Sequence, residues 1–395
     1  MANAAAKPTR GSVDAHERGK PAARTRITRA ATAPQPPQPR DDPHRLQIAA
    51  PSCGLLDALP GQSLSITYWF DAPTVRLMPA RRIRLVGALQ SARSDASETL
   101  TSARAFDVVR TIPSVPAGVG RVSVTMRVAD VAPGRWHVVA HPEDDAAFAA
   151  TGETGTAVVA AESAPGVALG AWSAFVAIGA LVGLVLFSFQ IQSVGLPMLT
   201  TLALAFGACL VGLIGAKVYF KAQATSPASW LSSGGMCVQG FIIGALTVLA
   251  LGASFARLPL LTVLDAASAP LLVGISIGRI GCFRAGCCAG RPSAQRIAMW
   301  SSDRQLGVRR IPTQLLEGMG ALGLAVLAVL MFHFETTMPA GALVLQSLGG
   351  YVLLRQTLLP YRALPRREGW RRPFAAALSA AATLIAVSVM AMAAA

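Results

Sequence analysis

The chain has 395 residues, of which 53% are hydrophobic and only 14% are charged, and its mean hydropathy is +0.49. This composition is typical of integral membrane proteins and excludes a simple soluble enzyme. The formal net charge is +15. The basic residues lie in an N-terminal tail and in loops between apolar segments. That distribution favours anionic lipid as a partner, and we expect no nucleic acid.

Two regions precede the apolar part of the chain. Residues 1–46 are rich in Ala, Pro, Arg and Thr without apolar periodicity, which predicts a disordered basic tail. No apolar stretch lies near Met1, so we expect no cleavable secretory signal. Residues 47–162 contain short alternating runs separated by turn residues, at 63–70, 84–89, 121–128 and 135–140. This pattern predicts an all-β, immunoglobulin-like sandwich domain.

Residues 166–395 form a series of apolar segments. Each gives about twenty residues of helix, enough to cross a hydrocarbon core of about 30 Å. We place the segments at 168–189, 195–219, 234–253, 259–279, 312–332, 339–359 and 373–394. The sequence therefore predicts a mostly α, polytopic membrane protein with about seven transmembrane helices. No internal repeat is visible, which disfavours a transporter built from inverted halves.

Residues 278–291 place several arginines directly after an apolar run. An arginine at membrane depth costs a few kcal/mol, so one that is retained there faces a cavity, a partner or a polar ligand. Anionic lipid headgroups are the ligand class that this pattern indicates. The alternative is a short cytoplasmic loop whose arginines only follow the positive-inside rule.

Three cysteines, Cys282, Cys287 and Cys288, lie in the same stretch. A redox or metal cluster is one interpretation, but the spacing is not CxxC and no histidine accompanies it. We expect small, polarizable packing residues, with no metal and no structural disulfide framework.

Five elements in order carry a family resemblance across roughly residues 215–362. Residues 215–219 resemble a Gly-Ala-Arg helix end, and residues 234–240 are similar to Gly-Gly-Met-x-x-His-Gly. Asp265 and Pro270 fit an Asp-x-x-x-x-Pro approach to the signature at 278–290, and residues 312–317 are similar to Pro-Ser/Thr-Gln-Leu-Tyr-Glu. In this order and spacing, the elements resemble the prolipoprotein diacylglyceryl transferases.

The resemblance implies an activity. Such a protein moves a diacylglyceryl group from phosphatidylglycerol to the lipobox cysteine thiol of a prolipoprotein and releases glycerol phosphate. It implies a multi-pass protein of the bacterial plasma (inner) membrane that needs no cofactor. An arginine suits this chemistry because it binds a phosphate with two parallel hydrogen bonds and takes up the developing charge. A base must also help the acceptor thiol ionise, since the thiolate is the nucleophile.

The resemblance also implies site residues. Arg279 matches the signature arginine and would bind phosphate, while Arg355 and Arg362 would assist and Glu317 would orient an arginine. The remaining signature positions would line the donor site, with glycines that let the backbone approach the headgroup. They are Gly281, Cys282, Gly286, Cys287 and Gly290.

Several positions depart from the family pattern. Gln239 stands where the family has a histidine proposed as the base, and an amide cannot take a proton. Gln239 remains a candidate catalytic position, and a hydrogen bond between helices is its alternative role. Cys282 and Cys287 replace an asparagine and a glutamate of the signature. The alternative function is therefore a catalytically altered relative that binds anionic phospholipid and displays the β-sandwich as an interaction module.

Two arguments about orientation disagree. Most basic residues of the membrane part follow the second, fourth and sixth apolar segments, on the side of the N-terminal region. The positive-inside rule places this side in the cytoplasm. The family resemblance places it outside, where lipoproteins emerge. Arginines that serve a headgroup site inflate the charge count, so both orientations stay open at this point.

Overall fold

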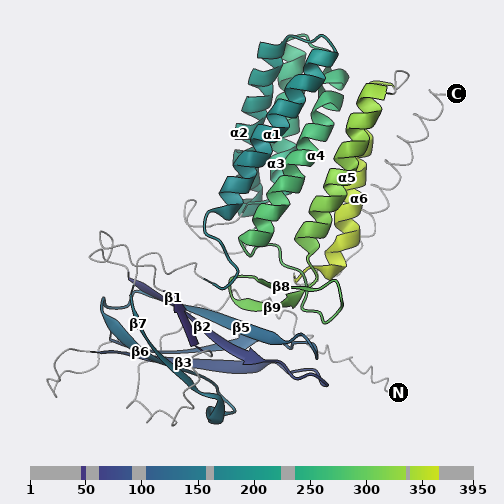
Figure 1. Cartoon of the computed structure of the whole chain (residues 1–395). Coiled ribbons are helices and arrows are strands. Elements are labelled where there is room, and N and C mark those ends of the chain that lie inside the picture. Colours follow the sequence, from purple (N-terminus) through teal and green to yellow (C-terminus); the bar gives the residue numbers. More distant parts are fainter. Residues whose placement is uncertain are drawn as a thin grey trace, which may run out of the picture.

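The computed structural model describes residues 46–49, 62–90, 104–156, 164–223, 236–334 and 339–363. Within these ranges a helical bundle stands on a β region (Figure 1). Its six helices are each long and apolar enough to cross a membrane. They are α1 (Ala171–Ser193), α2 (Met198–Gln223), α3 (Val238–Phe255), α4 (Leu260–Arg284), α5 (Thr313–Phe334) and α6 (Ala342–Leu358). Residues 1–45 of the predicted tail (1–46) and the predicted seventh segment at 373–394 lie outside the described residues, and Leu46 is the first residue of a strand.

Glycines allow the helices to approach closely. A Cβ atom added to Gly179 of α1 would lie 2.8 Å from the carbonyl oxygen of Gly274 on α4. Gly215 of α2 and Gly240 of α3 are related in the same way, with a Cβ on Gly215 only 2.5 Å from the Gly240 oxygen. Small residues at such crossings let backbones pack without intervening side chains. The glycines therefore allow the close backbone approach within the helix pairs α1–α4 and α2–α3.

The β region consists of two antiparallel sheets that share one buried apolar core. One sheet has the order β1-β2-β5-β9-β8 and the other β4-β3-β6-β7. The N-terminal strands are β1 (Leu46–Ala49), β2 (Ser63–Asp71), β3 (Arg81–Leu89), β4 (Ala105–Ile112), β5 (Arg121–Ala129), β6 (Arg135–Pro142) and β7 (Ala150–Gly155). The predictions of β2, β3, β5 and β6 are confirmed.

The first sheet is completed by a hairpin from the membrane part of the chain. Strands β8 (Met299–Ser302) and β9 (Leu306–Arg310) lie between α4 and α5, and β9 pairs with β5 at Ser123–Gly307 and Val124–Leu306. The ring of Trp300 stacks on Trp69 with 5.6 Å between centroids. Leu306 is buried in the core of the β region. The β region thus includes a segment outside the predicted 47–162 domain.

This hairpin fixes the β region at one end of the bundle, where α4 ends and α5 begins (Figure 1). Two further contacts hold the same junction. The Ala168 amide donates to the Arg284 carbonyl at 2.8 Å, and Arg304 Nε donates to the Ala285 carbonyl at 2.8 Å. The signature residues that follow α4 therefore lie at the end of the bundle that faces the β region.

Candidate active site

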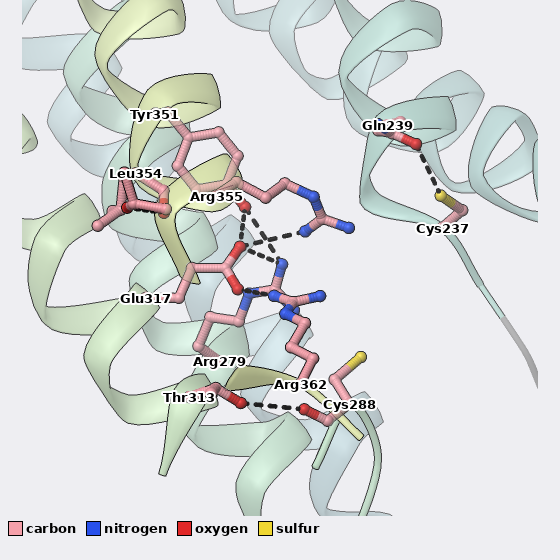
Figure 2. Close-up of polar contacts among 11 residues, drawn as sticks. Cys237, Gln239, Arg279, Cys288, Thr313, Glu317, Tyr351, Leu354, Arg355 and Arg362 are labelled. Carbon is pink, nitrogen blue, oxygen red and sulfur yellow. Dashed lines mark hydrogen bonds and ion pairs between the residues drawn. The ribbon is translucent and has the colours of Figure 1, made fainter. Parts of the chain in front are cut away.

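Glu317 is the centre of a buried polar cluster inside the helical bundle (Figure 2). Its side chain lies one turn into α5 and is fully buried. Arg279 Nη2 donates to its Oε1 atom at 2.6 Å, and Arg355 Nη1 donates to the same atom at 3.1 Å. Arg362 Nη2 forms a very short contact with Oε2. We call Arg279, Arg355, Arg362 and Glu317 the arginine–glutamate cluster.

Tyr351 also belongs to this centre, although the sequence analysis did not single it out. Its hydroxyl donates to Glu317 Oε1 at 2.7 Å and accepts a hydrogen bond from Arg279 Nη2 at 3.2 Å. Tyr351 precedes Arg355 by four residues on α6, so the two side chains share one helix face. That spacing was the available sequence signal.

The charges of the cluster do not balance. Three guanidinium groups surround one carboxylate, and Arg279 and Arg362 are only 5% and 3% exposed. Burial lowers the pKa of Arg362, against the opposing effect of Glu317. Arg362 Nε is buried without a hydrogen-bond partner among the described residues. Since unpaired buried charge is costly, this arrangement is suited to an anionic ligand that receives the remaining N–H groups.

The chain after α6 is joined to the signature loop by backbone hydrogen bonds. Arg291 N donates to the Tyr361 carbonyl at 2.8 Å, and Ala363 N donates to the Ala289 carbonyl at 2.9 Å. Gly290 and Arg362 form an isolated antiparallel bridge. This pairing brings Arg362 beside Arg279, which lies more than eighty residues earlier in the sequence.

The three signature glycines pack against the protein itself. A Cβ on Gly290 would lie 1.9 Å from the Ile311 carbonyl oxygen, and one on Gly281 would lie 2.7 Å from Phe175 Cβ. Gly286 has a φ of +68° and would meet the Ser302 carbonyl oxygen at 2.7 Å. Protein atoms occupy the space into which a Cβ would project at each of these positions, so the glycines let the loop pack closely. Their expected role in admitting a headgroup stays a prediction.

The two signature cysteines predicted at the site belong to a compact group. The sulfur atoms of Cys282, Cys287 and Cys288 all lie within 4.8 Å of one another. We call these residues the three-cysteine cluster. Cys282 is buried, Cys287 is intermediate and Cys288 is exposed. The cluster adjoins the arginines, because the Cys288 side chain lies beside Arg362 in Figure 2.

Gln239 lies at the start of α3, across from Arg355 in Figure 2. Its Oε1 atom accepts a weak hydrogen bond from Cys237 Sγ at 3.7 Å. That partner is only two residues away, so this contact does not join two helices. The structure thus brings the three predicted arginines together on Glu317, whereas Gln239 lies on a separate helix, α3.

The helical bundle and its buried, positively charged site define a multi-pass membrane protein. A sequence profile described as prolipoprotein diacylglyceryl transferase matches residues 159–394, more than half of the chain. The chain therefore belongs to the prolipoprotein diacylglyceryl transferase family, as the sequence motifs predicted.

Curated relatives carry the name phosphatidylglycerol--prolipoprotein diacylglyceryl transferase. The protein from Bordetella bronchiseptica is 31% identical over 158 residues, which cover 38% of this chain and 58% of the relative. The protein from Dehalococcoides mccartyi is 30% identical over 150 residues, which cover 37% and 56%. The protein from Hydrogenovibrio crunogenus is 32% identical over 124 residues, which cover 31% and 46%. The chain thus spans less than two thirds of the length of these relatives.

Proposed function

We propose that this protein transfers a diacylglyceryl group from phosphatidylglycerol to the lipobox cysteine of a prolipoprotein. The observation that carries the proposal is the excess of positive charge in the arginine–glutamate cluster, where three buried or half-buried arginines share one carboxylate. The headgroup phosphodiester supplies the missing negative charge. Family membership and the names of the curated relatives support the same reaction.

In this proposal Arg279 and Arg362 bind the headgroup phosphate, and Arg355 assists from α6. Glu317 and Tyr351 hold the guanidinium groups in place, as their hydrogen bonds to Arg279 indicate. When the acceptor sulfur attacks the glycerol carbon, a carbon–sulfur bond forms and the carbon–oxygen bond to phosphate breaks. Glycerol phosphate leaves, and the arginines stabilise the charge that develops on it.

The setting of the reaction follows from the acceptor. An exported prolipoprotein requires a bacterial plasma (inner) membrane and a site that faces away from the cytoplasm. The β region lies at the site's end of the bundle, so in this orientation it lies where acceptors emerge. The proposal also includes a seventh transmembrane helix at 373–394, in addition to the six helices. It further includes an immunoglobulin-like topology for the two sheets of the β region.

The direct test is a transfer assay with purified full-length protein, labelled phosphatidylglycerol and a lipobox peptide. We expect Arg279→Ala to lower the transfer rate about 10²- to 10³-fold, the usual loss when one donor to a developing anion is removed. Arg296→Ala is the matched control, because Arg296 is exposed in the loop that follows the same signature. Its rate should equal that of the wild type.

A different result would favour the alternative function. If the wild type binds phosphatidylglycerol through Arg279 but forms no product, the protein is a lipid-binding relative that displays the β region to a partner. If Arg279→Ala transfers as fast as the wild type, the phosphate does not bind at the arginine–glutamate cluster and the proposal is wrong.

A further inference from the structure

The proposed reaction needs a group that ionises the acceptor thiol. Neither Gln239 nor the arginine–glutamate cluster supplies one. Gln239 cannot accept a proton. Glu317 already receives hydrogen bonds from three arginines and from Tyr351. A thiol is a poor nucleophile until it becomes a thiolate. The protein must therefore activate the acceptor sulfur in another way.

The three-cysteine cluster is compact enough to become a metal site after a small movement. Its sulfur atoms lie within 4.8 Å of one another, at the end of α4 and in the loop that follows. Zinc–sulfur bonds of about 2.3 Å place the sulfurs of a tetrahedral site about 3.8 Å apart. A contraction of the cluster by no more than about 1 Å therefore closes it around one ion.

The backbone of the cluster is already held in place from outside. The Cys287 carbonyl accepts a hydrogen bond from Gln314 Nε2 at 2.8 Å, and the Cys288 carbonyl accepts one from Thr313 Oγ1 at 3.4 Å. Both partners lie in the first turn of α5, one turn before Glu317. The same helix thus orients the cysteines and the arginine–glutamate cluster.

We propose that Cys282, Cys287 and Cys288 bind a thiophilic divalent metal ion such as Zn²⁺, whose fourth position takes the acceptor cysteine. This inference rests on the proposed function and replaces our sequence expectation that the cysteines only fill space. Three protein ligands with one open position are the usual arrangement of a catalytic zinc site. Cys288 is the exposed member, so the cluster can be reached from outside the protein.

The step balances without an external oxidant or reductant. The acceptor thiol loses its proton to water as its sulfur binds the metal, because a coordinated thiol is deprotonated. The bound sulfur then donates an electron pair to the glycerol carbon, and the electron pair of the broken carbon–oxygen bond leaves with the phosphate. The product is a thioether, which carries no charge and dissociates from the metal.

The neighbouring arginines suit such a site electrostatically. Three thiolates and one divalent ion carry a net charge of −1, and an acceptor thiolate makes it −2. Arg279 and Arg362 belong to a cluster with excess positive charge, and the Cys288 side chain lies beside Arg362 in Figure 2. In this proposal the excess positive charge of the arginine–glutamate cluster serves both the metal–thiolate group and the headgroup phosphate.

Cobalt binding tests the site directly. Reduced, full-length protein is titrated with Co²⁺, and thiolate-to-cobalt charge-transfer absorption reports binding. We expect one ion per chain, with affinity lowered at least about 10-fold in Cys282→Ser, Cys287→Ser or Cys288→Ser, a loss that even outer partners of a ligand cause. Cys209→Ser is the control, because Cys209 lies on α2 outside the cluster. Equal binding by all four variants, or no binding, overturns the inference.

The acceptor peptide tests the fourth position. A lipobox peptide should change the cobalt spectrum, whereas the same peptide with serine in place of cysteine should not. An unchanged spectrum overturns the inference. Chelator treatment should abolish lipid transfer, and Zn²⁺ should restore it. If chelated protein and the three serine variants transfer normally, the metal inference fails and the proposed function stands. If the peptide thiol binds cobalt but zinc-loaded protein makes no product, the proposed transfer fails and the metal site stands.

Discussion

Two buried arginine groups lie on either side of the signature loop and differ in their charge balance. Arg310 is 2% exposed and donates to Asp303 Oδ2 at 2.6 Å and to the carbonyls of Gly290 and Leu306. One carboxylate therefore neutralises one arginine. At Glu317, one carboxylate serves three. Arg310 and Arg362 each have a buried Nε without a partner among the described residues. The charge balance and the bonds of Arg310 to two backbone carbonyls therefore separate the structural arginine from the one suited to a ligand.

Removing the shared carboxylate should have the largest effect. Glu317→Gln leaves three arginines around a neutral amide, so we expect the free energy of unfolding to fall by about 3–5 kcal/mol, the cost of breaking a buried ion pair. Denaturant unfolding in detergent measures it. Glu153→Gln is the control, since Glu153 is half-exposed, its pair with Arg135 is 3.9 Å long, and it should lose no more than about 1 kcal/mol. Equal losses in the two variants would contradict the central role of Glu317.

Substituting the signature arginine by lysine keeps the charge but loses the planar pair of donors. We expect Arg279→Lys to lower the transfer rate about 10²-fold or more, because lysine binds phosphate only as a point charge. Unfolding of the variant, followed in parallel, separates this loss from a loss of structure. A variant that folds and retains full activity would show that charge alone suffices.

Arg310, whose charge is balanced by Asp303, should affect stability and not the binding of lipid. Arg310→Lys removes hydrogen bonds to buried carbonyls, so we expect a loss of about 1–3 kcal/mol in stability. Its affinity for phosphatidylglycerol, measured on folded protein, should stay unchanged. A loss of lipid affinity with normal stability would place Arg310 in the anion site. The contrast between Arg310 and the arginine–glutamate cluster would then be wrong.

A substitution at the junction between the β region and the bundle should lower stability less than Glu317→Gln does. Trp300→Ala removes the stacking on Trp69 and the hydrogen bond from its indole N–H to the Arg121 carbonyl at 3.2 Å. We expect the free energy of unfolding to fall by about 1–3 kcal/mol, the sum of one aromatic pair and one hydrogen bond. Faster proteolysis of the loop between α4 and α5 would report weaker docking. Unchanged proteolysis would mean that the remaining contacts, among them the β5–β9 pairing and the burial of Leu306, hold the hairpin without Trp300.

The smallest effect is expected at Gln239. If the metal site activates the acceptor, Gln239→His should change the transfer rate little. A missing general base, once restored, would instead raise the rate about 10²-fold or more. The assay with labelled donor therefore decides between a cysteine-bound metal and a histidine-type base.

The sequence was sufficient for the local features of this protein. Hydropathy placed six described helices, and alternation placed strands β2, β3, β5 and β6. The motif spacing selected Arg279, Glu317, Arg355 and Arg362, and the structure brings these residues together. Such features depend on residues that are close along the chain or that match a family pattern.

Only the tertiary structure decided how these parts meet. The β8–β9 hairpin joins a sheet built almost two hundred residues earlier, and no local pattern records that pairing. Tyr351 becomes part of the site because α6 packs beside α5 at the level of Glu317. The cysteines converge because the chain turns after α4, and Arg362 reaches the site because the chain after α6 pairs with the signature loop. The sequence determined which segments are apolar enough to cross the membrane and which arginines follow them. Long-range packing determined the charge balance around each buried arginine.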